Sequence, residues 1–358
     1  MRNSGGVITP TPDRPDQAAH RLDLPPGWSA ATPHEPDVTE LTELLRRQEQ
    51  HGRGWAGASE HDVLVEVSET GYLTRENVVV RDPDGQLRGW AGAHDRASGR
   101  MLLLVVVDPR LDDTLGDRVA QTLFAWAEQA AREVGARREL RAQQIDSGAF
   151  ADDARQRRWL ASAGYDHVRT WWQMSRPVTA EEADLDPATR AGVRIRRVER
   201  EGDGLPAAED LHAVHDVLEE AFADHFNSHT ETFEEFLSRL RSDPGHRWDH
   251  WWLAEIVEEG HDPVPAGALV GSVKEGGAGR PDGSYVEYLG VRKLARGRGV
   301  ASALLRTIVA DAAARGRDRV GLEVDADSPT GADRLYVSMG WTTAYLTESW
   351  HREVLVAG

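Results

Sequence analysis

Cysteine is absent from the chain. Its absence excludes disulfides, thiolate metal ligands and cysteine nucleophiles. The chain also lacks any apolar run as long as a membrane span requires. The N-terminus does not show the charged-then-apolar pattern of a secretory signal. We therefore expect a soluble, cytoplasmic protein that does not insert into a membrane.

Positive charge is in short supply. Lys and Arg number 42 against 60 Asp and Glu, so the formal net charge is −18. Nucleic acids and anionic membranes bind basic surfaces, and we expect neither as a partner. An acidic surface attracts a cationic amine, although most acidic surfaces serve only solubility. The length of 358 residues is too great for one ordinary core and predicts two domains.

The most informative segment is a glycine-rich turn, Arg296-Gly297-Arg298-Gly299. The apolar run Val286–Val291 before it predicts a buried strand, and the apolar spacing after it predicts a helix. Such a turn aims backbone N–H groups at the positive end of a helix dipole, which makes a phosphate site. Glycine permits the tight bend and the close approach of a ligand.

Two similar strings show that the halves of the chain are related. They are RWLASAGY at 158–165 and RLYVSMGW at 334–341. Each predicts a short helix closed by a glycine, followed by an aromatic residue that opens a strand. Upstream, the strand Met101–Val107 precedes a helix ending at Gly135, as Val286–Val291 precedes one ending at Gly316. A duplication of this kind predicts the same fold twice.

The remaining elements of the second half complete one pattern. We expect strands at Val193–Val198, Trp251–Val257, Ala266–Lys274, Val320–Val324 and Thr342–Val354, and helices at Leu211–Phe222 and Thr330–Met339. The order is β-α-β-β-β-α-β-α-β, which predicts an α/β (α+β) mixed sheet with helices on its faces. In the first half, we expect matching strands at Asn77–Val80, at Leu87–Ala93 and near Glu139–Ala142.

Composition marks the boundaries of the predicted domains. Residues 1–23 are rich in Pro, Gly, Asp and Thr without an apolar period, and we expect a disordered tail. Residues 24–178 form the first predicted domain, 179–191 a polar linker and 192–358 the second domain. The glycine-rich turn therefore belongs to the second domain.

The turn and its surroundings resemble a known family. Arg296-Gly297-Arg298-Gly299-Val300-Ala301 is similar to the Arg/Gln-x-x-Gly-x-Gly/Ala signature of the GNAT superfamily of acyl-CoA-dependent acetyltransferases. The preceding strand, the following helix and the RLYVSMGW string stand in the family's order. The whole chain resembles a tandem GNAT protein with a mycothiol synthase-like domain duplication, a likeness to which the string AFADH at 221–225 adds.

This resemblance implies two tandem GNAT folds and direct acetyl transfer to an amine in a ternary complex. It places acetyl-CoA in a V-shaped gap between the fourth and fifth strands of the second half. The pyrophosphate would bind the N–H groups of Arg298, Gly299, Val300 and Ala301, and the pantetheine would pair with the backbone of Leu289 and Val291. We expect Arg296 to contact the phosphates, because Arg292, Lys293 and Arg298 crowd the same turn; the alternative is a surface ion pair.

Two side chains are candidates for the catalytic chemistry. Tyr336 is the candidate acid, since a phenol holds its proton at neutral pH; the alternative is a packing tyrosine. Glu287 is the candidate base, alone or through a water; the alternative is a solvated bystander. Relatives carry that glutamate where this chain has Tyr285, so either the base is shifted or the substrate arrives deprotonated. Because strand side chains alternate, we expect Tyr285, Glu287, Leu289 and Val291 to share one face. The backbone N–H of Val291 is the candidate oxyanion donor.

The cofactor and acceptor sides hold further candidates. Ser328 stands where many relatives have an asparagine that contacts the cofactor, although a helix N-cap at Ser328 or Thr330 is favoured. Candidates for the acceptor pocket are Asp224, His225, Asn227, His229 and Tyr285. His225 and His229 have a metal-binding spacing, but no third ligand is evident and we expect no metal. The nearby tryptophans either wall a pocket or pack a core, and we expect at least one in the core; they are Trp248, Trp251 and Trp252.

The first half departs from the pattern at the same places. When Val119 is aligned with Val300, residues 115–118 stand opposite residues 296–299. In this alignment the first half has no arginine opposite Arg296 and no glycine opposite Gly299. Carboxylates crowd that turn and would repel a pyrophosphate; they are Asp112, Asp113 and Asp117. Leu160 stands opposite Tyr336. We therefore predict that the first domain is non-catalytic, supports the second and walls its acceptor cleft.

These inferences favour an acetyl-CoA-dependent N-acetyltransferase that acts on a small primary amine, with the chemistry in the second domain. A peptide or protein amine is the alternative substrate. The alternative of another class is a non-enzymatic acyl-CoA-binding or interaction protein. A tandem pair is compatible with a monomer or a homodimer.

Overall fold

A computed structural model describes the chain over residues 22–96, 99–200, 204–223, 232–241, 245–276, 280–327 and 331–356. The chain divides into two compact units. Unit 1 comprises Met1–Leu44, Glu66–Ile145 and Glu353–Gly358, and unit 2 comprises Leu45–Val65 and Asp146–Arg352. The units therefore interleave along the sequence. Of the predicted disordered tail, residues 1–21 lie outside the described residues, while the Asp23 carbonyl accepts a hydrogen bond from Thr122.

Unit 1 is built on strands in the order β1 (Ser29–Ala31), β2 (Arg75–Arg81), β3 (Leu87–Asp95), β4 (Arg100–Val107) and β5 (Ala142–Phe150), whose last residues pass into unit 2. Its helices are α1 (Val38–Arg53), α2 (Glu60–Val67) and α3 (Asp113–Arg137). The residues of α1 and α2 are divided between the two units. The expected strands at 77–80, 87–93 and 101–107 are confirmed. The fifth strand expected near Glu139–Ala142 is present, but it lies further along the chain, at Ala142–Phe150.

The end of α3 also differs from the expectation. Gly135 does not close this helix, which continues to Arg137. The left-handed position belongs to Glu139, with φ 56°, and the N–H of Leu140 bonds back to the carbonyl of Gly135. Gly135 serves close packing instead, because a Cβ there would lie 2.4 Å from a methyl of Val356.

Replacing Glu139 by glycine is expected to stabilise unit 1. A left-handed conformation costs an L-residue about 1–2 kcal/mol, and the greater unfolded-state entropy of glycine offsets part of that gain. We expect the free energy of unfolding to rise by about 0.5–1 kcal/mol in urea denaturation. The matched control is Glu133→Gly in the exposed interior of α3, which should lower it by about 1 kcal/mol. A loss of stability in Glu139→Gly would contradict this account.

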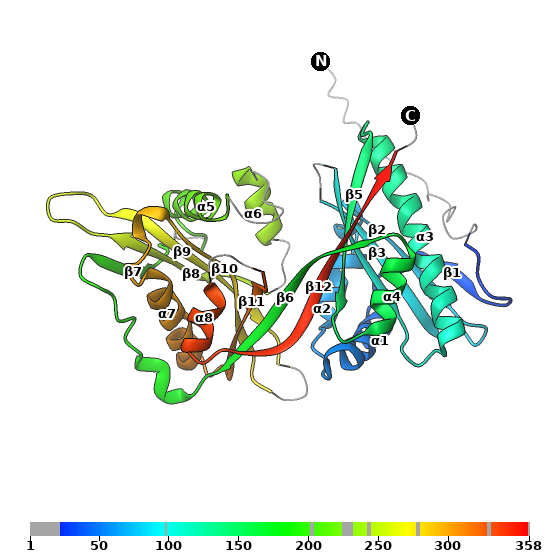
Figure 1. Ribbon diagram of the computed structural model, residues 1–358, viewed down its shortest axis with the longest axis horizontal. Helices are drawn as coiled ribbons and strands as arrows, with labels where there is room; N and C mark the ends of the chain where they lie inside the picture. The colour runs from blue at the N-terminus through cyan, green and yellow to red at the C-terminus, as the bar shows by residue number, and fades with distance from the viewer. Residues whose placement is uncertain are drawn as a thin grey trace, which may run out of the picture. The chain divides into compact units, whose positions relative to one another are not determined.

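Unit 2 contains the glycine-rich turn. Its elements are α4 (Ala154–Ser162), β6 (Asp166–Pro177), β7 (Val193–Arg197), α5 (Ala208–Phe222), α6 (Phe233–Arg241), β8 (His246–Ile256), β9 (Val264–Lys274), β10 (Gly283–Val291), α7 (Val300–Ala314), β11 (Arg319–Asp325), α8 (Ala332–Ser338) and β12 (Thr342–Leu355). The strands lie in the order β12-β6-β11-β10-β9-β8-β7 (Figure 1). Only β10 and β11 are parallel neighbours among these strands, which confirms the predicted mixed sheet. The helix α6 was not expected from the sequence.

The position of β6 was also not expected. This strand belongs to the first half of the sequence, yet it pairs with β11 on one side and with β12 on the other (Figure 1). Gln173 of β6 consequently faces Glu323 of β11 in the strand register. A segment of the first predicted domain thus forms part of the sheet that carries the second.

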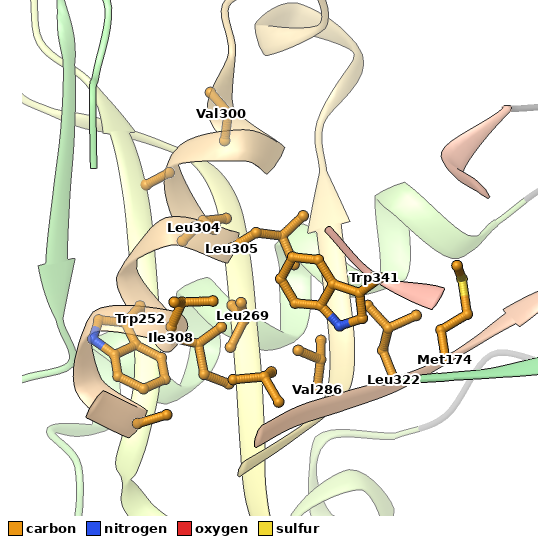
Figure 2. Packing of buried hydrophobic residues seen from close by; sticks show 14 of the residues in the cluster. Met174, Trp252, Leu269, Val286, Val300, Leu304, Leu305, Ile308, Leu322 and Trp341 are labelled. Carbon is orange, nitrogen blue, oxygen red and sulfur yellow. The ribbon is translucent and has the colours of Figure 1, made fainter. Parts of the chain in front are cut away.

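Two apolar cores cover the opposite faces of this sheet. On one face, α7 packs Val300, Leu304 and Ile308 against a cluster that includes Trp252 and Trp341 (Figure 2). On the other face, α5 and α6 pack against a cluster that includes Trp251. The neighbours Trp251 and Trp252 therefore both lie in cores, one on each side, as strand alternation requires.

The two short helices confirm the internal repeat. Gly164 after α4 and Gly340 after α8 are both left-handed, with φ of 78° and 94°. The residue after each glycine donates its N–H to a carbonyl within the helix, from Tyr165 to Leu160 and from Trp341 to Tyr336. The same capping geometry therefore occurs at matching places in the duplicated sequence.

The predicted linker contributes to the fold of unit 2. A short 3-10 helix over Ala180–Asp184 follows β6, and Ala183 and Leu185 pack against the core beneath α7. The Glu182 carboxylate accepts a hydrogen bond from the N–H of Thr179 and pairs with Arg176. These contacts anchor the segment that precedes β7 to the core of unit 2.

Candidate active site

The site begins where β10 and β11 separate. These parallel strands are registered only at Ser284–Val320, Tyr285–Gly321 and Val286–Leu322. The pairing of β10 with β9 on its other side shifts between Val286 and Tyr288, which marks a β-bulge at Glu287. A bulge bends a strand and increases its twist. In the described part of the chain, β10 continues to Val291 without further registered partners on β11, so the two strands diverge.

The bulge overturns one expectation about side-chain direction. Leu289 and Val291 pack toward the cluster under α7, whereas Tyr288 packs against the cluster under α5. The Glu287 carboxylate instead contacts Ser272, which stands opposite Tyr285 in the register. Glu287 and Tyr285 therefore share a face, but Leu289 and Val291 do not share it. The alternation of side chains is interrupted because the extra residue of the bulge turns two successive side chains the same way.

The glycine-rich turn lies directly beyond the diverging end of β10. A 3-10 turn over Lys293–Ala295 leads to Gly297 and Gly299, whose φ values are 77° and 78°. Gly299 is the N-cap of α7, and the first bond within the helix runs from the N–H of Ala303 to the carbonyl of Gly299. The N–H groups of the first helical turn therefore point away from α7 without an intrahelical acceptor. The N–H of Arg298 donates to the carbonyl of Ala295 at 3.2 Å.

Some arginines around this turn are bonded to other parts of unit 2, and others are exposed. Arg292 pairs with Glu220 at 2.8 Å and donates to the carbonyl of Pro265, so it braces the turn from below. Arg296 and Arg298 are exposed. Arg190, which the sequence placed in the linker, donates to the carbonyl of Gly297 at 2.7 Å. A single arginine in a polar stretch carried no signal of this contact.

Tyr336 lies on α8 and is half-buried. Its ring packs edge-on against Trp341 with centroids 6.3 Å apart, and it contacts the same core as Leu289 and Val291. Burial raises the pKa of Tyr336 to about 12. The phenol therefore carries its proton throughout the physiological pH range, as a general acid must.

Glu287 is held by two partners rather than solvated at a free edge. Ser272 donates its hydroxyl to Oε1 of Glu287 at 2.5 Å, and the Lys274 ammonium lies 3.3 Å from the same atom. Lys274 also lies 5.1 Å from the centroid of the Tyr285 ring. Burial, with the nearby charges of Glu323 and Glu287, raises the pKa of Tyr285 well above its ordinary value. Tyr285 is thus a neutral hydroxyl beside charged groups.

Several candidate residues lie outside the described residues. They are Asp224, His225, Asn227, His229, Ser328 and Thr330. Among the residues that the structure does describe, no group of His, Asp and Glu has the arrangement of a metal site. In the same residues, no helix combines the length and the apolar character needed to span a membrane.

Unit 1 provides an internal comparison for the turn. Val119 of α3 lies against Gly89 of β3, as Val300 of α7 lies against Gly267 of β9. The helix α3, however, already begins at Asp113, and the Asp112 carboxylate accepts the N–H of Leu115. A carboxylate therefore takes an amide at the end of α3 that corresponds to the open end of α7.

The geometry agrees with comparisons to known proteins. Residues 211–341 match the model of the acetyltransferase (GNAT) family. A GCN5-related N-acetyltransferase from Sphaerobacter thermophilus is 26% identical with a TM-score of 0.70, and the match covers 93% of this chain and 97% of that one. No curated protein matches the chain.

Two further structures share the fold at lower identity. A tandem GNAT protein from the clavulanic acid biosynthesis pathway has a TM-score of 0.65 at 15% identity, over 92% of this chain and 100% of that one. The N-myristoyltransferase of Saccharomyces cerevisiae with bound myristoyl-CoA has a TM-score of 0.57 at 11% identity, over 97% and 84%. Residues 211–341 are therefore a domain of the acetyltransferase (GNAT) family, and the duplicated fold and the matched structures support a tandem GNAT-superfamily acyltransferase.

Proposed function

We propose that this protein transfers an acetyl group from acetyl-CoA to a small primary amine, with both substrates bound at once in unit 2. One observation carries the proposal. The pairing of β10 and β11 ends at Val286–Leu322, and β10 then leads into the turn that caps α7. An acyl thioester extended between the strands would thus have a phosphate site at the end of its path.

The residues of the turn fit a pyrophosphate. A Cβ at Gly297 would meet nothing within 4 Å, so the space beside the left-handed turn is open. The N–H groups of Gly299, Val300 and Ala301 offer donors at the positive end of α7, and Arg298 and Arg296 add charge. Arg190 fixes the carbonyl of Gly297 and adds a further guanidinium. We assign the cofactor's pantetheine to the backbone of Leu289 and Val291, and Ser328 stays a predicted contact.

The side chains at the diverging strands supply the remaining chemistry. The amine nitrogen attacks the thioester carbonyl carbon, and the N–H of Val291 stabilises the oxyanion. As the C–S bond breaks, Tyr336 gives its proton to the departing thiolate. Glu287 accepts the proton that the attacking nitrogen loses, and solvent returns a proton to Tyr336. The products are the acetamide and the free thiol of CoA.

We also propose that the first half carries no catalytic site of its own. The Asp112 carboxylate takes the N–H of Leu115 at the helix end that would face a pyrophosphate. The Asp112 carboxylate and a pyrophosphate bound there would both be negatively charged, so they would repel each other. Leu160 occupies the place of Tyr336 in the matching short helix, so the acid is also missing.

Turnover with the full chain tests the proposed function. We expect free CoA thiol to appear from acetyl-CoA only when a primary amine is added, with the acetylated amine visible by mass spectrometry. A panel of small alkylamines and of peptides with a free N-terminal amine compares small-molecule substrates with peptide substrates. We expect the small amines to give the higher kcat/KM. Release of CoA at the same rate with and without every amine would contradict the proposal.

A further inference from the structure

We propose that Glu323, oriented by Gln173, is a second catalytic carboxylate, and that the acceptor therefore arrives as an ammonium ion. Glu323 receives the proton that must leave the ammonium before its nitrogen has a lone pair. This inference rests on the proposed function and divides the proton transfers of that reaction between two glutamates.

The first evidence is the position of the two carboxylates. The last registered pair of the parallel strands is Val286–Leu322. The next residue on β10 is Glu287 and the next on β11 is Glu323, so both stand where the strands begin to part. A reacting group lodged between the strands would have one glutamate on each side.

The second evidence is the difference between their partners. Glu287 is neutralised by Lys274 and accepts from Ser272. Glu323 accepts a hydrogen bond from Nε2 of Gln173 and, within the described residues, forms no ion pair. An amide donor orients a carboxylate without cancelling its charge. Glu323 therefore keeps a negative charge that attracts a cation, while Glu287 has its own counter-ion.

Gln173 is fixed by three groups from three strands. Its Nε2 donates to Glu323 and, at 3.0 Å, to the hydroxyl of Thr347 on β12. Its Oε1 accepts from the Tyr285 hydroxyl at 3.5 Å. The residue is only 9% exposed, and the two acceptors of Nε2 and the one donor to Oε1 fix the orientation of the amide. Gln173 is thus a positioning residue, and it comes from β6 of the first half of the sequence.

The charged surroundings favour proton exchange at Glu323. Partial desolvation by the surrounding strands and the charge of Glu287 raise the pKa of Glu323, while the bond from Gln173 lowers it, and the net direction is upward. The titratable groups that face this cluster are Tyr285, Glu287, Lys274 and Tyr345. Glu323 retains access to solvent, so it passes its proton to water after each turnover.

The proton balance closes with these assignments. The ammonium gives one proton to Glu323 and becomes a neutral amine. The amine attacks the thioester and gives a second proton to Glu287, while Tyr336 protonates the thiolate and is reprotonated through solvent. Per turnover, the acetamide and the CoA thiol form and one proton is released.

The test compares an alkylamine with an O-alkyl hydroxylamine of the same size, which is already neutral at pH 7.5. In Glu323→Gln, we expect kcat/KM for the alkylamine to fall about 100-fold at pH 7.5 and the loss to shrink as the pH rises. The neutral hydroxylamine should lose less than about threefold. Gln173→Leu should show the same pattern with a smaller loss, and Glu275→Gln, an exposed glutamate after β9, should resemble the parent.

An equal loss for both acceptors at every pH, in both Glu323→Gln and Gln173→Leu, means a structural role and overturns the inference, as does an unchanged rate in Glu323→Gln. If the parent enzyme acetylates the alkylamine normally, either of these two results contradicts only the role of Glu323 and does not contradict the proposed function. A parent that acetylates no amine refutes the proposed function and this inference together. If Glu323→Gln does not fold, the pH profile of Gln173→Leu decides alone.

Discussion

Arg298→Glu is expected to weaken the binding of CoA about 100-fold. Arg298 is exposed in the turn between two left-handed glycines, beside the open N-terminal end of α7. Reversing its charge would remove the proposed charge-assisted hydrogen bond to phosphate, a kind of bond worth about 1.5–3 kcal/mol, and would add repulsion between like charges. Because 1.4 kcal/mol is a factor of ten, the change in Kd is large. Isothermal titration calorimetry with CoA measures it directly.

A matched control separates the local effect from the change in net charge. Arg247→Glu introduces the same charge change at the start of β8. The neighbouring residue His246 is registered with Ser272, which lies near the end of β9 that is remote from the glycine-rich turn. This control should bind CoA within about threefold of the parent. Arg190→Ala, which removes the donor to the carbonyl of Gly297, should fall between the two. Unchanged CoA binding in Arg298→Glu would rule out the phosphate site at this turn.

Tyr336→Phe is expected to lower kcat about 100-fold while the KM for acetyl-CoA changes little. The substitution removes only the hydroxyl, and the packing of the ring against Trp341 remains. General-acid assistance typically contributes about 100-fold or more, and it acts in the transition state rather than in the bound complex. Steady-state kinetics with a saturating amine gives both parameters.

The pH profile supplies the control for this assignment. Because burial raises the pKa of Tyr336 to about 12, its ionisation should not appear in the profile of the parent between pH 6 and pH 9. The remaining activity of Tyr336→Phe should rise when the acceptor and cofactor are unchanged but a thioester with a more acidic thiol is supplied, since such a thiolate leaves without a proton. An unchanged kcat would show that Tyr336 only packs.

Local features were predictable because they depend on neighbours in the sequence. The left-handed conformations of Gly299 and Gly340 follow from the need to start or close a helix where a Cβ is unfavourable. The same reasoning failed at Gly135, because a glycine also serves close packing and Glu139 took the left-handed position. Sequence pattern alone does not distinguish these two uses of glycine.

Features that depend on a distant partner were not predictable. The bulge at Glu287 exists only in relation to β9, and it reversed the expected faces of Leu289 and Val291. The contact of Arg190 with Gly297 joins residues far apart in the sequence. Neither leaves a periodic trace in the amino-acid order, because both arise from the pairing of strands and the path of the linker.

The sequence by itself determined the duplication, the glycine-rich turn and the phenol of Tyr336, since short-range spacing and residue type specify a strand, a turn and a helix in order. Only the tertiary structure decided which carboxylates meet. Placing β6 between β11 and β12 brings Gln173 to Glu323, and the short pairing of β10 with β11 sets Glu287 across from it. Strand order is a long-range property, because it reflects the burial and hydrogen bonding of the whole sheet and not the preferences of any one segment.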